Sequence, residues 1–181
     1  MEDRRVKEQD INIVEAIRRH PLFQQYYKRL EQAEKDRRFC CHQMNHLLDV
    51  ARIAYIQNLE EGLRFPKKMI YAAAILHDIG KARQYEEGIP HEIASAEIAE
   101  EILKDISLGK HKEFSDKNIF SEEEQQEILG AIRSHRIYRE DMNSFEKLLY
   151  ISDKKSRQCF ACSAEQECNW SLDKKNMEID L

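Results

Sequence analysis

Residues 70–81 read Ile-Tyr-Ala-Ala-Ala-Ile-Leu-His-Asp-Ile-Gly-Lys, and the first seven form the most apolar run of a highly charged chain. Apolar residues on every face predict a helix that is buried on all sides and closely packed. Such a helix carries His77 and Asp78 into the interior at its end. Because burying an unpaired charge is costly, we expect both side chains to be hydrogen-bonded, paired or metal-bound. The alternative is an ordinary helix end, with Gly80 as the C-cap.

The size and charge of the chain indicate one domain with solvated surfaces. Its 181 residues are 41% hydrophobic and 35% charged, which is enough apolar material for a real core. No apolar run approaches the roughly 20 residues that cross a membrane, and the charged start lacks the apolar segment of a secretory signal. We therefore expect a cytoplasmic protein without a membrane partner. A net charge of -5 argues against a nucleic-acid partner.

The pattern of apolar residues predicts an all-α fold. Only five glycines and three prolines interrupt the chain, and no segment alternates with the period of a half-buried strand. We expect N-terminal helices at 1–37, broken at His20-Pro21 and packed as a hairpin on a core at 38–157, with a cysteine-containing tail at 158–181. The core helices are expected at 42–63, 66–78 and 91–106, after a capping box formed by Ser121 and Glu124, and from Asn143. Residues 107–120 are expected to form a surface loop.

Potential metal ligands occur at inward or helix-end positions of five predicted helices. They are His46, the doublet His77-Asp78, His91, His135 and Asp153. Imidazole and carboxylate together suit Zn, Mn, Fe or Ni better than Ca or Mg. Six ligands are too many for one catalytic ion with an open water position. They suit two divalent ions about 3.5–4 Å apart that share a bridging carboxylate, for which Asp78 is the natural candidate.

These residues resemble the HD-domain metal-dependent phosphohydrolase superfamily. Its pattern of a histidine, a His-Asp doublet and a later aspartate is matched by His46, His77-Asp78 and Asp153. The resemblance covers about residues 38–157 and includes the His-x-x-x-Val-Ala context of His46 and the Ser-Asp-Lys context of Asp153. Two additional histidines of the binuclear, six-ligand branch are matched by His91 and His135. The resemblance implies an HD-domain helical bundle that hydrolyses phosphate esters or anhydrides, often of nucleotides.

Within this superfamily the sequence is most similar to the bacterial hydrolases of symmetrical diadenosine tetraphosphate, which have the same ligand order. The group that cleaves cyclic di-GMP fits less well, because its Gly-Tyr-Pro signature is absent. The resemblance implies that His46, His77, Asp78 and Asp153 hold one ion and that Asp78, His91 and His135 hold the other. The expected substrate is a small phosphorylated compound, with a nucleotide favoured.

The expected chemistry is attack by a metal-activated water on phosphorus. Asp78 and Lys81 are the expected catalytic side chains, and Lys81 can also neutralise a phosphoryl oxygen or the leaving group. Arg136 and Arg157 can contact substrate farther out, although both are also compatible with solvated surface positions. His42 lies one turn before His46 and is expected either to line the substrate pocket or to have a surface or supporting role.

Two other functions are compatible with the same residues. Some members of the superfamily hold two irons with this ligand set and activate oxygen, so a di-iron oxygenase is one alternative. A nucleotide-sensing module that keeps the metal site without turnover is the other. Iron content with oxygen consumption would identify the first, and a tight nucleotide complex without product would identify the second.

The tail contains three cysteines within ten residues. Cys159 and Cys162 form a Cys-x-x-Cys pair, and Cys168 follows at a spacing that is not that of a common zinc module. A zinc ion or an iron–sulfur cluster needs four ligands, and Cys40 or Cys41 could supply the fourth. The alternative is a set of reduced thiols packed in the tail.

Overall fold

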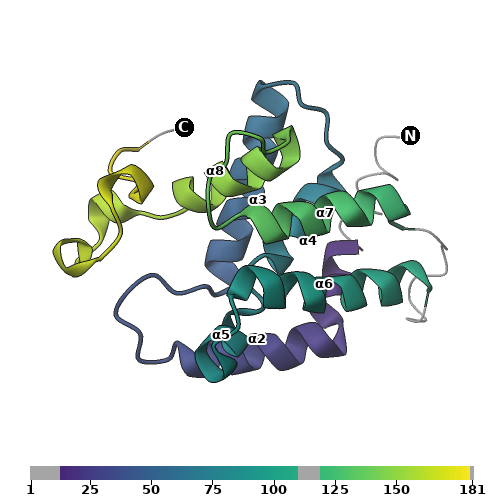
Figure 1. Ribbon diagram of the computed structural model, residues 1–181, viewed down its shortest axis with the longest axis horizontal. Helices are drawn as coiled ribbons and strands as arrows, with labels where there is room; N and C mark the ends of the chain where they lie inside the picture. The colour runs from purple at the N-terminus through teal and green to yellow at the C-terminus, as the bar shows by residue number, and fades with distance from the viewer. Residues whose placement is uncertain (1–12, 110–118, 180–181) are drawn as a thin grey trace.

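The computed structural model describes residues 13–109 and 119–179 (Figure 1). Residues 13–19 are helical, and the helices that follow are α2 (Pro21–Ala33), α3 (Met44–Glu60), α4 (Lys67–Leu76), α5 (Lys81–Glu87), α6 (His91–Ser107), α7 (Glu122–Ser134) and α8 (Ser144–Lys155). Three short 3-10 turns end the described chain, η1 (Cys159–Ala161), η2 (Glu165–Glu167) and η3 (Leu172–Lys174). No strand occurs among these residues. The all-α prediction is therefore confirmed, while residues 110–118 of the expected loop lie outside the described residues.

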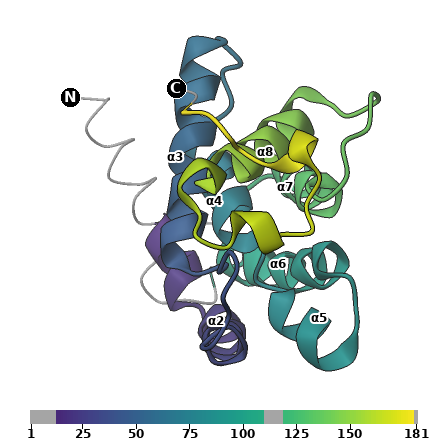
Figure 2. The same cartoon turned by 90° about the vertical axis from the view of Figure 1, so that its left-hand side faces the viewer.

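Helix α4 occupies the centre of the fold. Seven of its ten residues are buried, including Ile70, Ile75 and Leu76. The helices that contact it are α3, α6, α7 and α8. Figure 2 shows α4 enclosed by these helices, with α2 and α5 below them. Burial on all sides follows from the absence of any polar face in the run that precedes His77, so this prediction is confirmed.

Two capping boxes fix where the last helices begin. The Ser121 side chain accepts from the Glu124 amide, and the Glu124 side chain accepts from the Ser121 amide. Asn143 and Glu146 repeat the arrangement at the start of α8. These contacts satisfy amides that have no partner within the helix. They set the register that carries His135 to the end of α7 and Asp153 to the inner face of α8.

The turn after α4 differs from an ordinary glycine-capped helix end. Helix α4 ends at Leu76, and Gly80 has φ −80°, which is a right-handed conformation available to any residue. Gly80 precedes α5, a helix that was not predicted separately from the apolar pattern. A Cβ on Gly80 would lie 2.3 Å from the backbone nitrogen of Ser95 in α6. Glycine is required here because two backbones approach closely. The alternative of an ordinary helix end with Gly80 as the C-cap is wrong, because His77 is the C-cap of α4 and Gly80 is the N-cap of α5.

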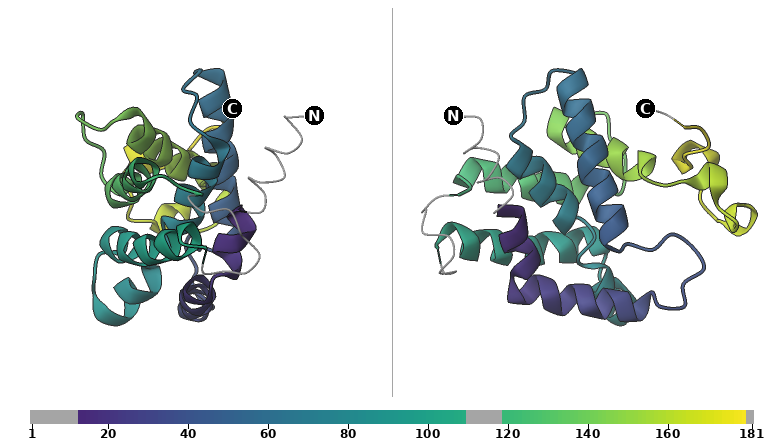
Figure 3. Two further views of the ribbon diagram at one scale, coloured as in Figure 1. Left: turned by 90° about the vertical axis from the view of Figure 1, so that its right-hand side faces the viewer. Right: turned by 180° about the vertical axis from the view of Figure 1, so that it is seen from behind.

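The C-terminal turns lie beside the loop that joins α2 to α3. Figures 1 and 3 both place this loop and the 3-10 turns at the same end of the molecule. Arg38 of the loop forms two 2.6 Å contacts with the Glu167 carboxylate in η2. No helix among residues 13–109 and 119–179 has the length and apolar character needed to cross a membrane.

Candidate metal centre

The fold brings all six predicted ligands together in two groups. The first contains His46, His77, Asp78 and Asp153, and the second contains Asp78, His91 and His135. Within each group, one potential ligand atom per residue lies within 4.8 Å of all the others. The residues come from α3, the α4–α5 turn, the first turn of α6, the end of α7 and α8. Segments far apart in the sequence thus meet at the end of the buried helix.

Asp78 belongs to both groups and directs one oxygen toward each. Its Oδ2 lies 3.1 Å from His77 Nε2 and 3.4 Å from His46 Nε2. Its Oδ1 lies 3.4 Å from His91 Nε2 and 3.7 Å from His135 Nε2. This geometry is compatible with a carboxylate that bridges two ions, and the bridging role of Asp78 stays a prediction.

Several buried atoms at this centre have no hydrogen-bond partner among the described residues. They are His46 Nε2, His77 Nε2 and both carboxylate oxygens of Asp78. Buried polar atoms are normally satisfied, because an unpaired one costs about 1–3 kcal/mol. Acceptor atoms that converge without donors are what a divalent cation requires. The residues present thus fit two metal ions.

The four histidines are oriented by contacts of their other ring nitrogen. Each Nδ1 lies next to an oxygen, at 2.7 Å from Ala74 O in His77, 2.6 Å from Ile132 O in His135, 2.6 Å from Gln84 Oε1 in His91 and 3.1 Å from Ser156 Oγ in His46. Donation from Nδ1–H to such an oxygen leaves the Nε2 lone pair directed into the centre. This is the neutral tautomer that binds metal, held by the kind of supporting contact that raises ligand basicity.

Charges at the centre favour ionised carboxylates. Burial alone would raise the pKa of Asp78, but the surrounding imidazoles, His77 foremost, hold it well below its usual value. Burial lowers the pKa of His91 to about 2. For His77, burial is outweighed by Asp78 and Asp153, which raise the pKa to about 9. Metal binding at Nε2 requires the neutral imidazole, so an ion bound there would displace this proton.

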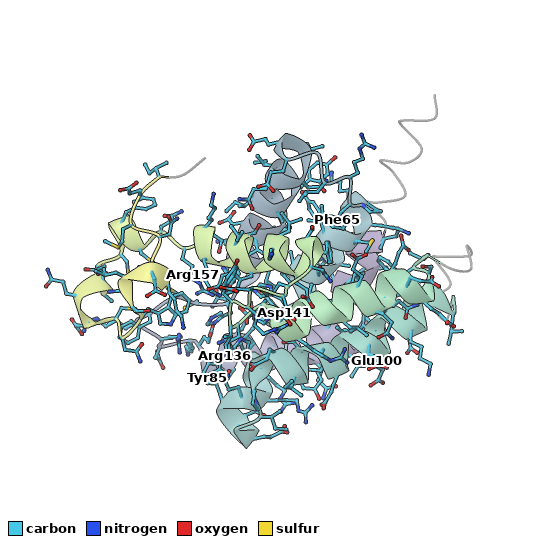
Figure 4. The ribbon with its side chains drawn as sticks, turned by 45° about the horizontal axis from the view of Figure 1, so that its top comes forward. Phe65, Tyr85, Glu100, Arg136, Asp141 and Arg157 are labelled. Carbon is cyan, nitrogen blue, oxygen red and sulfur yellow. The ribbon has the colours of Figure 1, made fainter. Side chains whose placement is uncertain are left out.

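Two cations hold Asp153 in place. Arg157 Nη2 donates to Asp153 Oδ1 at 2.9 Å, and Lys154 pairs with Asp153 Oδ2. Arg157 is buried, and its guanidinium lies 4.9 Å from the Trp170 ring. Figure 4 shows Arg157 where the C-terminal turns meet α8. A solvated surface position, one of the alternatives for Arg157, is therefore excluded.

The other predicted substrate contacts differ in their surroundings. Lys81 is partly buried, and burial lowers its pKa although Asp78 opposes this. Arg136 is exposed and lies 3.2 Å from the Glu92 carboxylate at the first turn of α6. Arg136 thus lies at the exposed edge of the candidate metal centre, which we call its rim, while Lys81 lies closer to the predicted ligands. Their roles in substrate binding stay predictions.

His42 is buried and takes part in a network that sequence reasoning missed. The fully buried Glu34 carboxylate lies 2.5 Å from His42 Nδ1, accepts from the His42 amide at 2.6 Å, and accepts from the Tyr85 hydroxyl at 2.8 Å. His42 Nε2 lies 3.9 Å from Asp78 Oδ2. Burial lowers the pKa of His42 to about 4, against the effects of Asp78 and Glu34. A neutral His42 therefore donates to Glu34 and turns its Nε2 lone pair toward the metal centre.

Replacing Glu34 by glutamine is expected to destabilise the protein. The amide cannot accept the three donors that the carboxylate accepts, so at least one buried donor loses its partner. We expect a loss of about 1–3 kcal/mol and a fall in Tm of roughly 3–10 °C, measured by thermal unfolding. Glu31→Gln on the exposed face of α2 is the matched control. Equal Tm values for the two variants would contradict this account of the network.

Comparison with known proteins is consistent with this geometry. The model of the HD domain family matches residues 44–158, which is more than half of the chain and includes every proposed metal ligand. The chain belongs to the HD domain family. An uncharacterized protein of Clostridium beijerinckii is 47% identical to this HD-domain protein over 154 residues, covering 85% of this chain and 89% of the relative.

A solved structure shows the same fold. The crystal structure of a predicted HD superfamily hydrolase from an uncultured Thermotogales bacterium matches the HD-domain protein with a TM-score of 0.57. The match covers 88% of this chain and 84% of the other at 23% sequence identity. At this identity the likeness establishes the helical architecture only. The two ligand groups, which lie within the residues matched by the HD domain family, are consistent with a binuclear HD centre.

Proposed function

We propose that this protein is a metal-dependent phosphohydrolase that acts on a nucleotide or another small phosphate ester or anhydride. The observation that carries the proposal is the position of Asp78, whose two oxygens face two separate sets of ligand atoms. A shared carboxylate between two ions is the arrangement used for in-line displacement at phosphorus. Membership in the HD domain family supports this choice.

The two groups of side chains would hold two divalent ions, chosen among Fe, Mn, Zn and Ni by the preference of these metals for imidazole and carboxylate. One ion would be held by His46, His77, Asp78 and Asp153, and the other by Asp78, His91 and His135. When bound, the ions supply a water of lowered pKa and a Lewis acid for the phosphoryl oxygens. The protein contributes rigid ligands, because the Nδ1 contacts fix every ring before metal binds.

Cationic side chains beside the ligands suit a substrate that carries several negative charges. Lys81 begins α5 three residues after Asp78, which supports a role in neutralising a phosphoryl oxygen or the leaving group. Arg157 is held on Asp153, next to the same centre. Arg136 on the rim can contact a more distant part of a long substrate. A dinucleoside polyphosphate, suggested by the order of the six ligands, matches this distribution.

A phosphate-release screen tests the proposal. Protein loaded separately with Mn²⁺, Fe²⁺, Zn²⁺ or Ni²⁺ is incubated with nucleotides, dinucleoside polyphosphates and simple phosphate esters, including symmetrical diadenosine tetraphosphate. We expect hydrolysis with at least one metal and its loss on chelation. Oxygen consumption by the iron form without phosphate release would favour the di-iron oxygenase. Tight nucleotide binding without product under any metal would favour a sensing module.

A further inference from the structure

The described tail, residues 158–179, contains little apolar core of its own. Cys159 and Ala164 are its buried hydrophobic residues, whereas Leu172 and Ile179 are 74% and 76% exposed. Burial of apolar area is normally what holds a segment in one conformation. Short segments without such a core are commonly held by a bound metal or by disulfides. All five cysteines of the chain are free thiols in the structure.

Contacts around the tail bring four of these cysteines into one region. The 2.6 Å contacts between Arg38 and Glu167 join two segments, with Cys40 two residues after the arginine and Cys168 directly after the glutamate. The amide of Cys162 donates to the carbonyl of Cys159 at 3.2 Å, which folds the Cys-x-x-Cys pair into a single turn. Turns η1 and η2 pack together, and Cys168 directly follows η2.

Cys159 is the central member of this set. It is buried, and burial raises the pKa of its thiol. Its turn, η1, packs against η2, which directly precedes Cys168, and the contact between Arg38 and Glu167 brings the loop of Cys40 to the same turn. Cys41 has different neighbours, since its sulfur lies 3.6 Å from the Phe39 carbonyl and 4.0 Å from the Arg37 carbonyl. Cys40, rather than Cys41, is therefore the fourth member.

We propose that Cys40, Cys159, Cys162 and Cys168 bind an iron–sulfur cluster that joins the tail to the loop between α2 and α3. Four cysteine thiolates are the usual ligands of such a cluster. A single zinc ion fits less well, because Zn–S bonds of about 2.3 Å place tetrahedral sulfurs roughly 3.8 Å apart. In the described parts of the chain, only the histidine and aspartate groups have three or more ligand atoms within 4.8 Å of one another. A cluster of several irons spreads its thiolates farther apart.

The cluster would hold two residues beside the metal centre. Cys40 precedes His42 by two residues, and Cys159 follows Arg157 by two residues. His42 faces Asp78, and Arg157 binds Asp153. The tail also supplies Trp170, which stacks on the Arg157 guanidinium. A group bound to both segments thus restrains the two segments that carry these side chains, whichever reaction the centre performs.

The test measures iron and acid-labile sulfide in the full chain, purified without oxygen and reconstituted with iron and sulfide. We expect sulfide together with visible charge-transfer absorption in the wild type. Both should fall at least tenfold in Cys159→Ser and Cys168→Ser. Cys41→Ser, which changes the neighbouring thiol, is the matched control and should keep them. Asp78→Asn should also keep the sulfide, because the histidine and aspartate centre contains none.

Three results would overturn the proposal. They are absence of sulfide from the reconstituted wild type, zinc bound by these cysteines without sulfide, and equal loss of sulfide in Cys41→Ser. Circular dichroism of each variant identifies a failure to fold. If Cys159→Ser does not fold, the half-buried Cys162 and Cys168 provide the decisive variants. Loss of phosphate release without loss of sulfide would count against the proposed function alone.

Discussion

Asp78→Asn is expected to empty both metal positions at once. Each Asp78 oxygen faces a different set of histidines, so removing its charge weakens both sets together. Single variants on either side should act on one set only, with His46→Ala affecting the first ion and His91→Ala the second. Apart from iron that accompanies sulfide at the cysteines, we expect about two ions per chain in the wild type, about one in each histidine variant and close to none in Asp78→Asn. Metal bound to the full chain, measured by elemental analysis after dialysis, gives these ratios.

The same substitution should abolish turnover while the helices remain. Metal ions contribute several kcal/mol to such reactions, so phosphate release should fall on the order of 10³-fold or more. Asparagine keeps the shape of the side chain, and helicity by circular dichroism is expected to stay near the wild-type value. Asp49→Asn on α3, where the carboxylate contacts Arg52 at 3.3 Å, is the control and should retain metal. Wild-type metal content in Asp78→Asn would refute the proposed centre.

The main features of the fold could be predicted because they depend on local patterns. The apolar run before His77 has no polar face, which made its burial inevitable once the chain folded. The capping residue Ser121 set the register that brought His135 inward. The six metal-facing residues were predicted from their order and residue types, and the structure brings them together.

The missed features depend on contacts between distant segments. Glu34 follows the amphipathic helix α2 in a stretch of charged residues. Only the fold shows that its carboxylate contacts His42 and Tyr85 and is buried by them. Burial of Arg157 arises from Trp170 in the tail. Helical periodicity reports which face of a segment is apolar, and it does not report which loop closes over a charge. A sequence pattern therefore predicted which residues gather at the candidate centre better than it predicted the residues that support them.

Gly80→Ala is expected to be among the most destabilising single-methyl additions in the chain. The new Cβ would lie 2.3 Å from the backbone nitrogen of Ser95 and 2.7 Å from the carbonyl carbon of Ala94. Backbone atoms of α6 cannot rotate away, so the helix itself must move. Such overpacking costs about 3 kcal/mol or more, which corresponds to a fall in Tm of roughly 6–12 °C. Movement of α6 also displaces His91 at its first turn, so the second ion should bind more weakly.

Gly130→Ala separates this steric effect from a general effect of replacing glycine. Gly130 lies inside α7, and its added Cβ would be 3.6 Å from the Glu146 carboxylate, which is an ordinary contact. Alanine is the better helix former there, so Gly130→Ala should raise stability by about 0.5–1 kcal/mol. Opposite shifts in Tm for the two variants are the expected result. A Gly80→Ala protein as stable as the wild type, with its full metal content, would mean that the close approach of the α4–α5 turn to α6 does not hold His91 in place.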